Sequence, residues 1–306
     1  MAKQFPFEEE FVLGMKSNWR QKHLQARFDA IPELRLVEFF IGEYDLEEHR
    51  LDIEKSMKEM AKRGAYVMLH EPTLFHGIRV NAAATDKEQQ KATRECHSKL
   101  EDMCESHENA AGFVCHGYNP PSPDTLGYVA VRQAREKRNA LLNHVMEGIN
   151  LRYKHAFVEN VPRKVFAKTD EITGIAAATR EFNEPGIGIC LDLPALSMTY
   201  KFKAFQSMDD AAKSIAKFSR DNLVPLYFHI GDEKGYKDSL EVGTGTVHFD
   251  KIVPHIKVGM IEVRPRNELN PVEAVRSYKA IMEMRQRERY WEITREAGDR
   301  MEQGKR

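Results

Sequence analysis

Six residues that could bind a metal each follow a short apolar run. The run Ile187–Leu191, for example, lies between Pro185-Gly186 and Pro194 and is too short for an isolated helix, so it is typical of a buried strand. A carboxylate at the end of such a strand is costly unless something pairs with it. The residues that end these runs are His70, His116, Glu159, Asp192, His229 and Glu262.

Three imidazoles and three carboxylates form a set of ligands for a divalent metal. Mixed nitrogen and oxygen donors suit Zn, Mn, Fe or Co better than Ca or Mg. If two metals about 3.5–4 Å apart share the set, Glu159 is expected to bridge them. The alternative interpretation is that some of these residues are ordinary ion-paired or supporting side chains, but their common position at strand ends favours a site.

The elements that must position these residues alternate along the chain. Successive members of the set are 33 to 46 residues apart, which leaves room for one helix and two loops. Two earlier apolar runs, at 11–15 and 36–41, bring the expected strands to eight. Alternation implies parallel strands with right-handed crossovers, so the sequence predicts a closed (β/α)8 TIM barrel whose strand ends converge on one mouth. An open dinucleotide-binding sheet is disfavoured because no GxGxxG follows the first strand.

Helices are expected between the strands. Apolar periodicity and cap signals place them at 18–30, 45–63, 87–106, 129–148, 169–182, from 207, at 248–255 and from 270. Asp45 with Glu48 reads as a capping box, and Gly64 ends that helix. The last helix is expected to fray into a charged tail at 285–306. We therefore predict a single domain at 1–306, with the barrel at about 10–290 and a charged C-terminal extension at 291–306.

Composition limits the class of protein. Hydrophobic residues make up 42% of the 306 residues and charged residues 30%, as in ordinary soluble globular proteins. No apolar run approaches the roughly 20 residues of a membrane span, and the N-terminus lacks the apolar core of a signal peptide. The four cysteines form no CxxC pair. We therefore predict a cytoplasmic protein with reduced cysteines and no membrane partner.

Other charged and polar residues near the strand ends are candidates for substrate binding. Arg163 and Arg264 follow the strand-end residues Glu159 and Glu262, where they could bind a phosphate or carboxylate; the alternative is a solvated loop charge. Asn81 lies in the loop after His70. Asp232, three residues after His229, could orient that ring or act as a base. The histidines expected at the surface are His97, His107, His144 and His155.

The order of these elements and strand-end residues resembles the endonuclease IV and xylose isomerase-like TIM-barrel superfamily over residues 10–290. The resemblance implies a four-ligand metal site made of Glu159 in FVENVP, Asp192 in CLDLPA, His229 in FHIGD and Glu262 in IEVRP. The run Val242–Val247 is similar to the Gly-x-Gly loop after the seventh strand. His70 in LHEP and His116 in CHGYNP match the imidazoles that the endonuclease branch adds.

The sequence also departs from the endonuclease pattern. Ala195 and Leu240 stand where that branch has further imidazoles, so a third metal would lack His ligands. The resemblance therefore implies one or two divalent metals per chain, Zn or Mn. The net charge of −1 does not indicate DNA as a partner, although a local basic rim could still bind phosphates.

Three functions remain open from the sequence. The resemblance favours isomerisation or epimerisation of a sugar or sugar phosphate through an enediolate, with Glu159 and Glu262 as the proton-transfer pair. The alternative is hydrolysis of a phosphodiester, as in endonuclease IV. A third hypothesis is a barrel that binds a ligand without catalysis. The charged run 283–289 beside Tyr290-Trp291 is compatible with a homo-oligomer contact.

Overall fold

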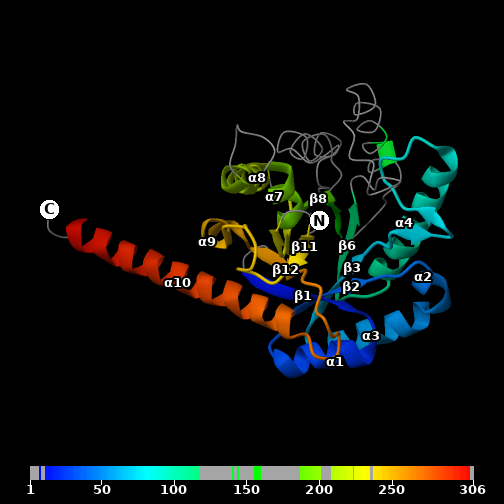
Figure 1. Ribbon diagram of the computed structural model, residues 1–306, viewed down its shortest axis with the longest axis horizontal. Helices are drawn as coiled ribbons and strands as arrows, with labels where there is room; N and C mark the ends of the chain where they lie inside the picture. Colours follow the sequence, from blue (N-terminus) through cyan, green and yellow to red (C-terminus); the bar gives the residue numbers. More distant parts are fainter. Residues whose placement is uncertain are drawn as a thin grey trace.

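The strands expected from the apolar runs close into a barrel. The computed structural model describes residues 7, 11–116, 140, 143–144, 155–159, 187–200, 208–222, 224–234 and 237–303. Parallel strands pair around a closed barrel in the order β1-β12-β9-β8-β7-β6-β3-β2 (Figure 1). Their bounds are β1 Val12–Asn18, β2 Leu36–Phe40, β3 Tyr66–His70, β6 Ala110–His116, β7 His155–Glu159, β8 Ile187–Asp192, β9 Leu226–Ile230 and β12 Val258–Ile261. The predicted (β/α)8 TIM barrel is confirmed.

Helices pack outside the strands. The described helices are α1 Gln21–Ala30, α2 Asp45–Glu48, α3 Arg50–Lys62, α4 Lys87–Glu105, α7 Leu193–Tyr200, α8 Met208–Asn222, α9 Phe249–Ile252, the 3-10 turn η1 Val253–His255, and α10 Val272–Gln303. The expected helix at 169–182 and nearly all of the one at 129–148 lie outside the described residues. Among the described residues, the helices include none that is long and apolar enough to cross a membrane.

The segment at 45–63 shows why the chain forms helices here and where the prediction was wrong. Apolar residues three or four apart place one face of α3 against the barrel, and Ile53, Met57 and Met60 are all buried. Gly64 follows α3 with φ +71°, a left-handed conformation that favours glycine. The expected single helix is instead split into α2 and α3, and Asp45 is no cap. Its Oδ2 accepts hydrogen bonds from the Trp19 indole at 2.9 Å and the Gly42 amide at 2.7 Å.

Two short hairpins follow strand ends where the sequence predicted loops, and a helix that the sequence did not predict, α7, follows β8. The hairpin β4 Leu74–Phe75 with β5 Ile78–Arg79 follows β3, and the hairpin β10 Asp232–Lys234 with β11 Lys237–Leu240 follows β9. Strands of two to four residues have too little sequence for a period-2 pattern to stand out. Helix α7 begins directly after β8, with Pro194 in its first turn, where a missing N–H costs nothing.

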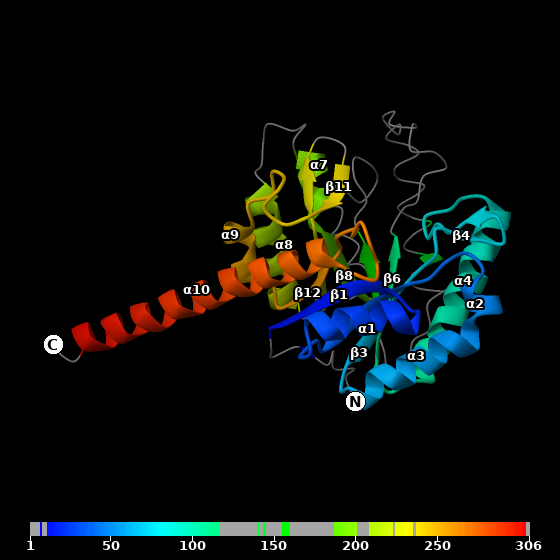
Figure 2. The same ribbon diagram turned by 60° about the horizontal axis from the view of Figure 1, so that its bottom comes forward.

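The last helix is longer than expected. It runs unbroken from Val272 to Gln303, so the expected fraying from Arg285 is wrong. The first part of α10 packs against β1, β12 and η1, and the remainder projects away from the barrel (Figure 2).

The core has two layers. Between strands and helices lies a large apolar cluster, and inside the barrel lies a smaller one that includes Leu36, Met68, Phe157, Tyr227 and Met260. A glycine lets the inner layer close: a Cβ at Gly188 would lie 2.7 Å from the Phe157 ring. The filled interior supports the mouth, so the site above it rests on packed strands.

Candidate metal centre at the barrel mouth

The strand ends bring all six predicted ligands together. In the paired strands His116 lies beside Glu159, and Asp192 lies beside His229. Ligand atoms of Glu159, Asp192, His229 and Glu262 all lie within 4.8 Å of one another, and so do those of His70, His116 and Glu159. Two candidate metal clusters therefore share one carboxylate, that of Glu159.

The two oxygens of Glu159 face different clusters. Oε1 lies 2.8 Å from Nδ1 of His229. Oε2 lies 3.4 Å from Nε2 of His70 and 3.4 Å from Nε2 of His116. The side chain is only 4% exposed. This is the arrangement expected of a carboxylate that bridges two cations.

Each imidazole of the centre is held by a hydrogen bond on the nitrogen that faces away from Glu159. His116 Nδ1 lies 2.7 Å from Glu71 Oε1, and His70 Nδ1 lies 2.9 Å from the Glu71 carbonyl oxygen. His229 Nε2 lies 2.9 Å from Glu38 Oε2. Carboxylates and carbonyls only accept, so each of these nitrogens carries a proton. The other nitrogen of each ring is thereby directed at the centre, as in metal sites with oriented histidine ligands.

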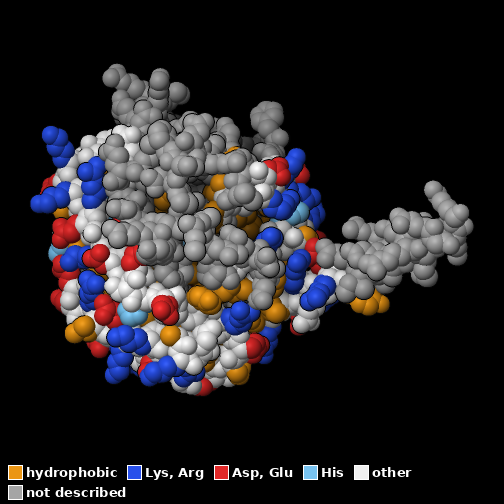
Figure 3. Space-filling view, turned by 180° about the vertical axis from the view of Figure 1, so that it is seen from behind, with side chains coloured by type: hydrophobic (Ala, Val, Ile, Leu, Met, Phe, Trp, Pro, Cys, Tyr) orange, Lys and Arg blue, Asp and Glu red, His pale blue; other side chains and the backbone are white. Residues whose placement is uncertain are grey.

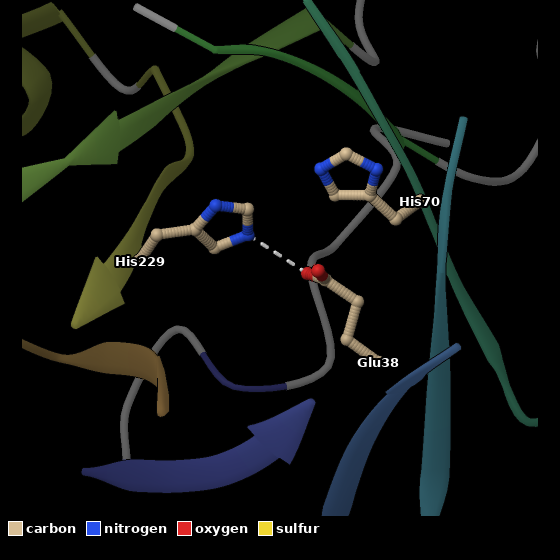
Figure 4. A group of neighbouring side chains, drawn as sticks. All are labelled: Glu38, His70 and His229. Carbon is tan, nitrogen blue, oxygen red and sulfur yellow. Dashed lines mark hydrogen bonds and ion pairs between the residues drawn. The ribbon is translucent and has the colours of Figure 1, made fainter. Parts of the chain in front are cut away.

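Sequence reasoning missed three residues of this arrangement: Glu38, Glu71 and Lys16. Glu38 is fully buried on β2 and accepts hydrogen bonds from the Tyr227 hydroxyl at 2.8 Å and from His229. Figure 4 shows Glu38, His70 and His229 pointing toward one another from three strands. Lys16 Nζ, on β1, lies 2.7 Å from Glu262 Oε1 and 3.2 Å from Glu38 Oε1. An acid inside the apolar run LVEFF was the available signal for Glu38.

The acids of the centre divide into two electrostatic classes. Burial alone would raise the pKa of Glu38, but His229 and Lys16 lower it to about 2. Burial is likewise outweighed at Glu159, mainly by His229, and at Glu262, mainly by Lys16, so both pKa values lie well below the usual range. Asp192 differs: burial and the charges of Glu159 and Glu262 raise its pKa well above the usual range. Adding a cation would relieve that repulsion.

The basic groups respond to the same carboxylates. Burial opposes the charge on His116, but its hydrogen bond to Glu71 and the charge of Glu159 raise its pKa to about 9. Burial also opposes the charge on His229 and on Lys16, and the neighbouring carboxylates raise both pKa values above their usual ranges. In the metal-free protein these groups therefore supply the positive charge that the acids need.

The residues fit a divalent metal. Three buried carboxylate oxygens face basic groups of the centre: Glu38 Oε1 lies 3.2 Å from Lys16 Nζ, Glu159 Oε2 lies 3.4 Å from two imidazoles, and Glu262 Oε2 lies 2.7 Å from His229 Nδ1. A divalent cation among them would take the place of the imidazole protons as the partner of these oxygens. The donor set combines imidazole nitrogen with carboxylate oxygen, which suits transition metals such as Zn or Mn.

The residues predicted to bind substrate have varied positions. Arg163 lies outside the described residues. Arg264 is exposed and its amide donates to the Ser239 carbonyl at 3.2 Å. Asn81 is 5% exposed, and its Oδ1 accepts from the Ala83 amide at 3.1 Å, so in this structure it shapes the loop before α4.

Asp232 organises a loop instead of reaching into the mouth. It is fully buried, and its carboxylate accepts hydrogen bonds from the amides of Glu233, Gly243, Gly245 and Val247 at 2.7 to 3.1 Å. A Cβ at Gly245 would lie 2.3 Å from Asp232 Oδ1, which explains a glycine there. The Gly-x-Gly loop thus wraps this carboxylate, and a contact between Asp232 and substrate stays a prediction.

The histidines expected at the surface are buried, so that prediction was wrong. His97, His107, His144 and His155 are 0%, 7%, 5% and 2% exposed. Nε2 of His97 lies 2.7 Å from Glu71 Oε2, and its Nδ1 lies 2.8 Å from His144 Nε2. His97 lies on α4, whose sequence is largely polar, and His155 begins strand β7. A histidine counts as polar in either pattern, so its burial is not indicated.

Solved structures with this architecture include sugar epimerases. The chain is similar to a D-tagatose 3-epimerase-like protein, with 18% identity, a TM-score of 0.62, and coverage of 89% of this chain and 96% of that one. The chain shares the (β/α)8 barrel fold of that protein. It is also similar to 3-keto-D-glucoside 4-epimerase from E. coli (15% identity, TM-score 0.59, 89% and 98% covered). A third similar structure is D-allulose 3-epimerase from Methylomonas sp. in complex with D-allulose (14% identity, TM-score 0.62, with 93% of this chain and 100% of that chain covered). No protein-family model and no curated protein matches the sequence.

Proposed function

We propose that the protein is a divalent-metal-dependent sugar isomerase or epimerase. The observation that carries the proposal is the four-ligand cluster of Glu159, Asp192, His229 and Glu262, which lies at the mouth of a barrel shared with 3-epimerases and a 4-epimerase. These four residues would hold the metal. When bound there, it supplies Lewis acidity toward two neighbouring substrate oxygens.

Glu159 and Glu262 would move the protons. One carboxylate takes the proton from the carbon beside the substrate carbonyl, and the electron pair of that C–H bond moves toward the carbonyl oxygen. The other carboxyl group, which must be protonated at that stage, gives its proton to the opposite face as the electron pair returns from the oxygen to the carbon, and this inverts the centre. Glu262 is the more open of the two, with 22% of its side chain exposed against 4% for Glu159. Lys16 holds Oε1 of Glu262 and leaves Oε2 facing the cluster.

Exchange of substrate protons with solvent tests this function. The protein loaded with Mn²⁺ or Zn²⁺ is incubated in D₂O with D-tagatose, D-allulose and D-fructose, and deuterium at the carbon beside the carbonyl is followed by NMR. Glu262→Gln is expected to lower exchange by about 10²–10⁴-fold, because the variant cannot take up the proton. The control is Glu283→Gln on α10, whose side chain is 66% exposed. Equal loss in both variants, or no exchange with any ketose, contradicts the proposal.

The second candidate is metal-assisted hydrolysis of a phosphodiester. The observation that favours it is the second cluster, His70 and His116 with Glu159 Oε2. There His70 and His116 would hold a further metal beside the four-ligand cluster. Ala195 and Leu240 offer no imidazole for a third one.

Metal content separates these possibilities. We expect two equivalents of Zn or Mn per chain, measured by elemental analysis of protein purified without chelators, because two clusters share Glu159. His116→Ala is expected to lower this to one equivalent. Ketose and phosphodiester substrates are then compared on both proteins: turnover of a phosphodiester that disappears with the second metal favours hydrolysis, and ketose turnover that survives favours the epimerase. One equivalent that survives the substitution contradicts a second metal.

The partners follow from the same reasoning. We propose a small sugar as substrate, because the similar solved structures are named as enzymes that act on sugars. Charged side chains of both signs are interspersed over the described part of the face in Figure 3. A homo-oligomer also stays a proposal, supported by the projecting α10 and by Tyr290, which is 65% exposed. A cytoplasmic location stays a prediction.

A further inference from the structure

A chain of buried polar side chains leads away from the metal centre. It begins at His116, whose Nδ1 lies 2.7 Å from Glu71 Oε1. Glu71 Oε2 lies 2.7 Å from His97 Nε2, and His97 Nδ1 lies 2.8 Å from His144 Nε2. Glu71 and His97 are fully buried and His144 is 5% exposed. Each contact is short enough to be a hydrogen bond between heavy atoms.

The hydrogen bonds that link these four side chains have a fixed direction from donor to acceptor. The Glu71 carboxylate only accepts, so both His116 Nδ1 and His97 Nε2 must carry protons. With Nε2 protonated, a neutral His97 accepts at Nδ1 from His144 Nε2. The backbone amide of His116 also donates to Glu71 Oε1 at 2.8 Å, so Glu71 accepts hydrogen bonds from both the ring and the main chain of His116.

Packing alone does not account for these residues. The ring of His97 lies 5.4 Å from the ring of Phe113, in surroundings that an apolar side chain would also fill. Two buried imidazoles and a buried carboxylate cost free energy unless all are hydrogen-bonded. Their hydrogen bonds end at His116, whose other nitrogen, Nε2, faces Glu159 Oε2.

We propose that Glu71, His97 and His144 form a positioning chain that holds His116 with its Nε2 directed at Glu159. None of the three is a ligand in the candidate cluster of His70, His116 and Glu159. Their side chains act through His116, and the Glu71 carbonyl also contacts His70 Nδ1. The role in metal binding rests on the function proposed above, whereas the restraint on His116 is a property of the protein alone.

Substitutions at His97 test the positioning chain. His97→Phe keeps an aromatic ring but cannot donate to Glu71. His97→Gln retains a donor that can reach Glu71 and serves as the conservative rescue. His107→Phe is the matched control, because His107 is also buried and lies just beyond the same helix, α4, outside the chain. His144→Phe removes only the outer link and replaces His97→Phe in the comparison if that variant does not fold.

Two measurements are made on each protein. In metal-free, ¹⁵N-histidine-labelled protein, NMR follows solvent exchange of the Nδ1 proton of His116. In the second, Zn²⁺ is titrated calorimetrically and the affinities of the first and second equivalents are compared. His97→Phe is expected to speed the exchange at least tenfold and to weaken the second equivalent by about 10–100-fold, the usual effect of removing a residue that supports a ligand. His97→Gln is expected to restore most of both, and His107→Phe to change neither.

Each result has a distinct meaning. Unchanged exchange and unchanged affinity in the His97→Phe and His144→Phe variants overturn the positioning chain, and so does an equal loss in His107→Phe. Should the parent protein bind no second Zn²⁺, the proposed metal centre fails, while the exchange of the His116 proton still decides whether Glu71, His97 and His144 restrain it. Fast exchange already present in the parent protein also overturns the inference.

Discussion

At the scale of single residues, Lys16 is the counter-charge of the metal centre. Its Nζ contacts Glu262 at 2.7 Å and Glu38 at 3.2 Å, and only 14% of its side chain is exposed. A buried carboxylate without a partner is strongly unfavourable. One lysine therefore allows two acids to stay ionised at the mouth before any metal binds.

Replacing Lys16 is expected to make the stability of the fold depend more strongly on a bound metal. Lys16→Met should destabilise the metal-free protein by about 3–5 kcal/mol, the usual cost of removing one partner of a buried ion pair. Zn²⁺ should restore much of the loss, because it supplies positive charge to the same acids. Urea unfolding with a chelator and with Zn²⁺ measures both effects.

The matched control for this substitution is Lys99→Met. Lys99 contacts Glu47 at 3.4 Å, and both side chains are about one third exposed, so its loss should cost under about 1 kcal/mol. Equal destabilisation by the two substitutions, or a Lys16→Met loss that Zn²⁺ leaves untouched, contradicts the assigned role.

At the scale of elements, the sequence predicts strands and their terminal residues well. An apolar run that stops at a His, Asp or Glu marks both the strand and the residue that faces the mouth, and this holds for β3, β6, β7, β8, β9 and β12. The supporting residues are harder to find. Glu38 lies within its strand and not at its end. Glu71 directly follows His70, which is the more obvious candidate ligand. His97 faces inward only because α4 packs against β6.

The same scale explains the errors in the loops. The wrapping of Asp232 depends on the backbone amides of Gly243, Gly245 and Val247, which lie eleven or more residues further along the chain. A glycine pair in the sequence indicates a tight loop but not which side chain it encloses. Such contacts are set by tertiary structure, so Asp232 was predicted at the mouth although its oxygens are occupied elsewhere.

At the scale of the whole molecule, a net charge of −1 conceals a strong concentration of charge. Glu71 and His116 depend on one another for ionisation, and Glu38 depends on His229 and Lys16 in the same interior region. The stability of the metal-free fold must therefore vary with pH through the ionisation of this one region, even though the surface carries charges of both signs.

The stability of the metal-free protein is expected to peak between about pH 4.5 and 6.5. The pKa of Glu38 and of Glu71 is lowered from 4.5 to about 2, so their stabilising effect is complete above 4.5 and is lost as the pH falls toward 2. The pKa of His116 is raised from 6.5 to about 9, so its contribution is complete below 6.5 and is lost as the pH rises toward 9. Asp192, whose pKa is raised, also favours the folded state less as pH rises.

Zn²⁺ should abolish the alkaline loss, because a metal requires deprotonated imidazoles and then provides the positive charge that protonated His116 had supplied. The free energy of unfolding in urea, measured from pH 3 to 9 with a chelator and with Zn²⁺, distinguishes the acid limb of the stability profile from the alkaline limb. A metal-free protein that gains stability between pH 6.5 and 9 would show that the protonated imidazole does not support the fold. A loss on that limb that persists with Zn²⁺ would show that the metal and the proton do not compete for the same buried carboxylates.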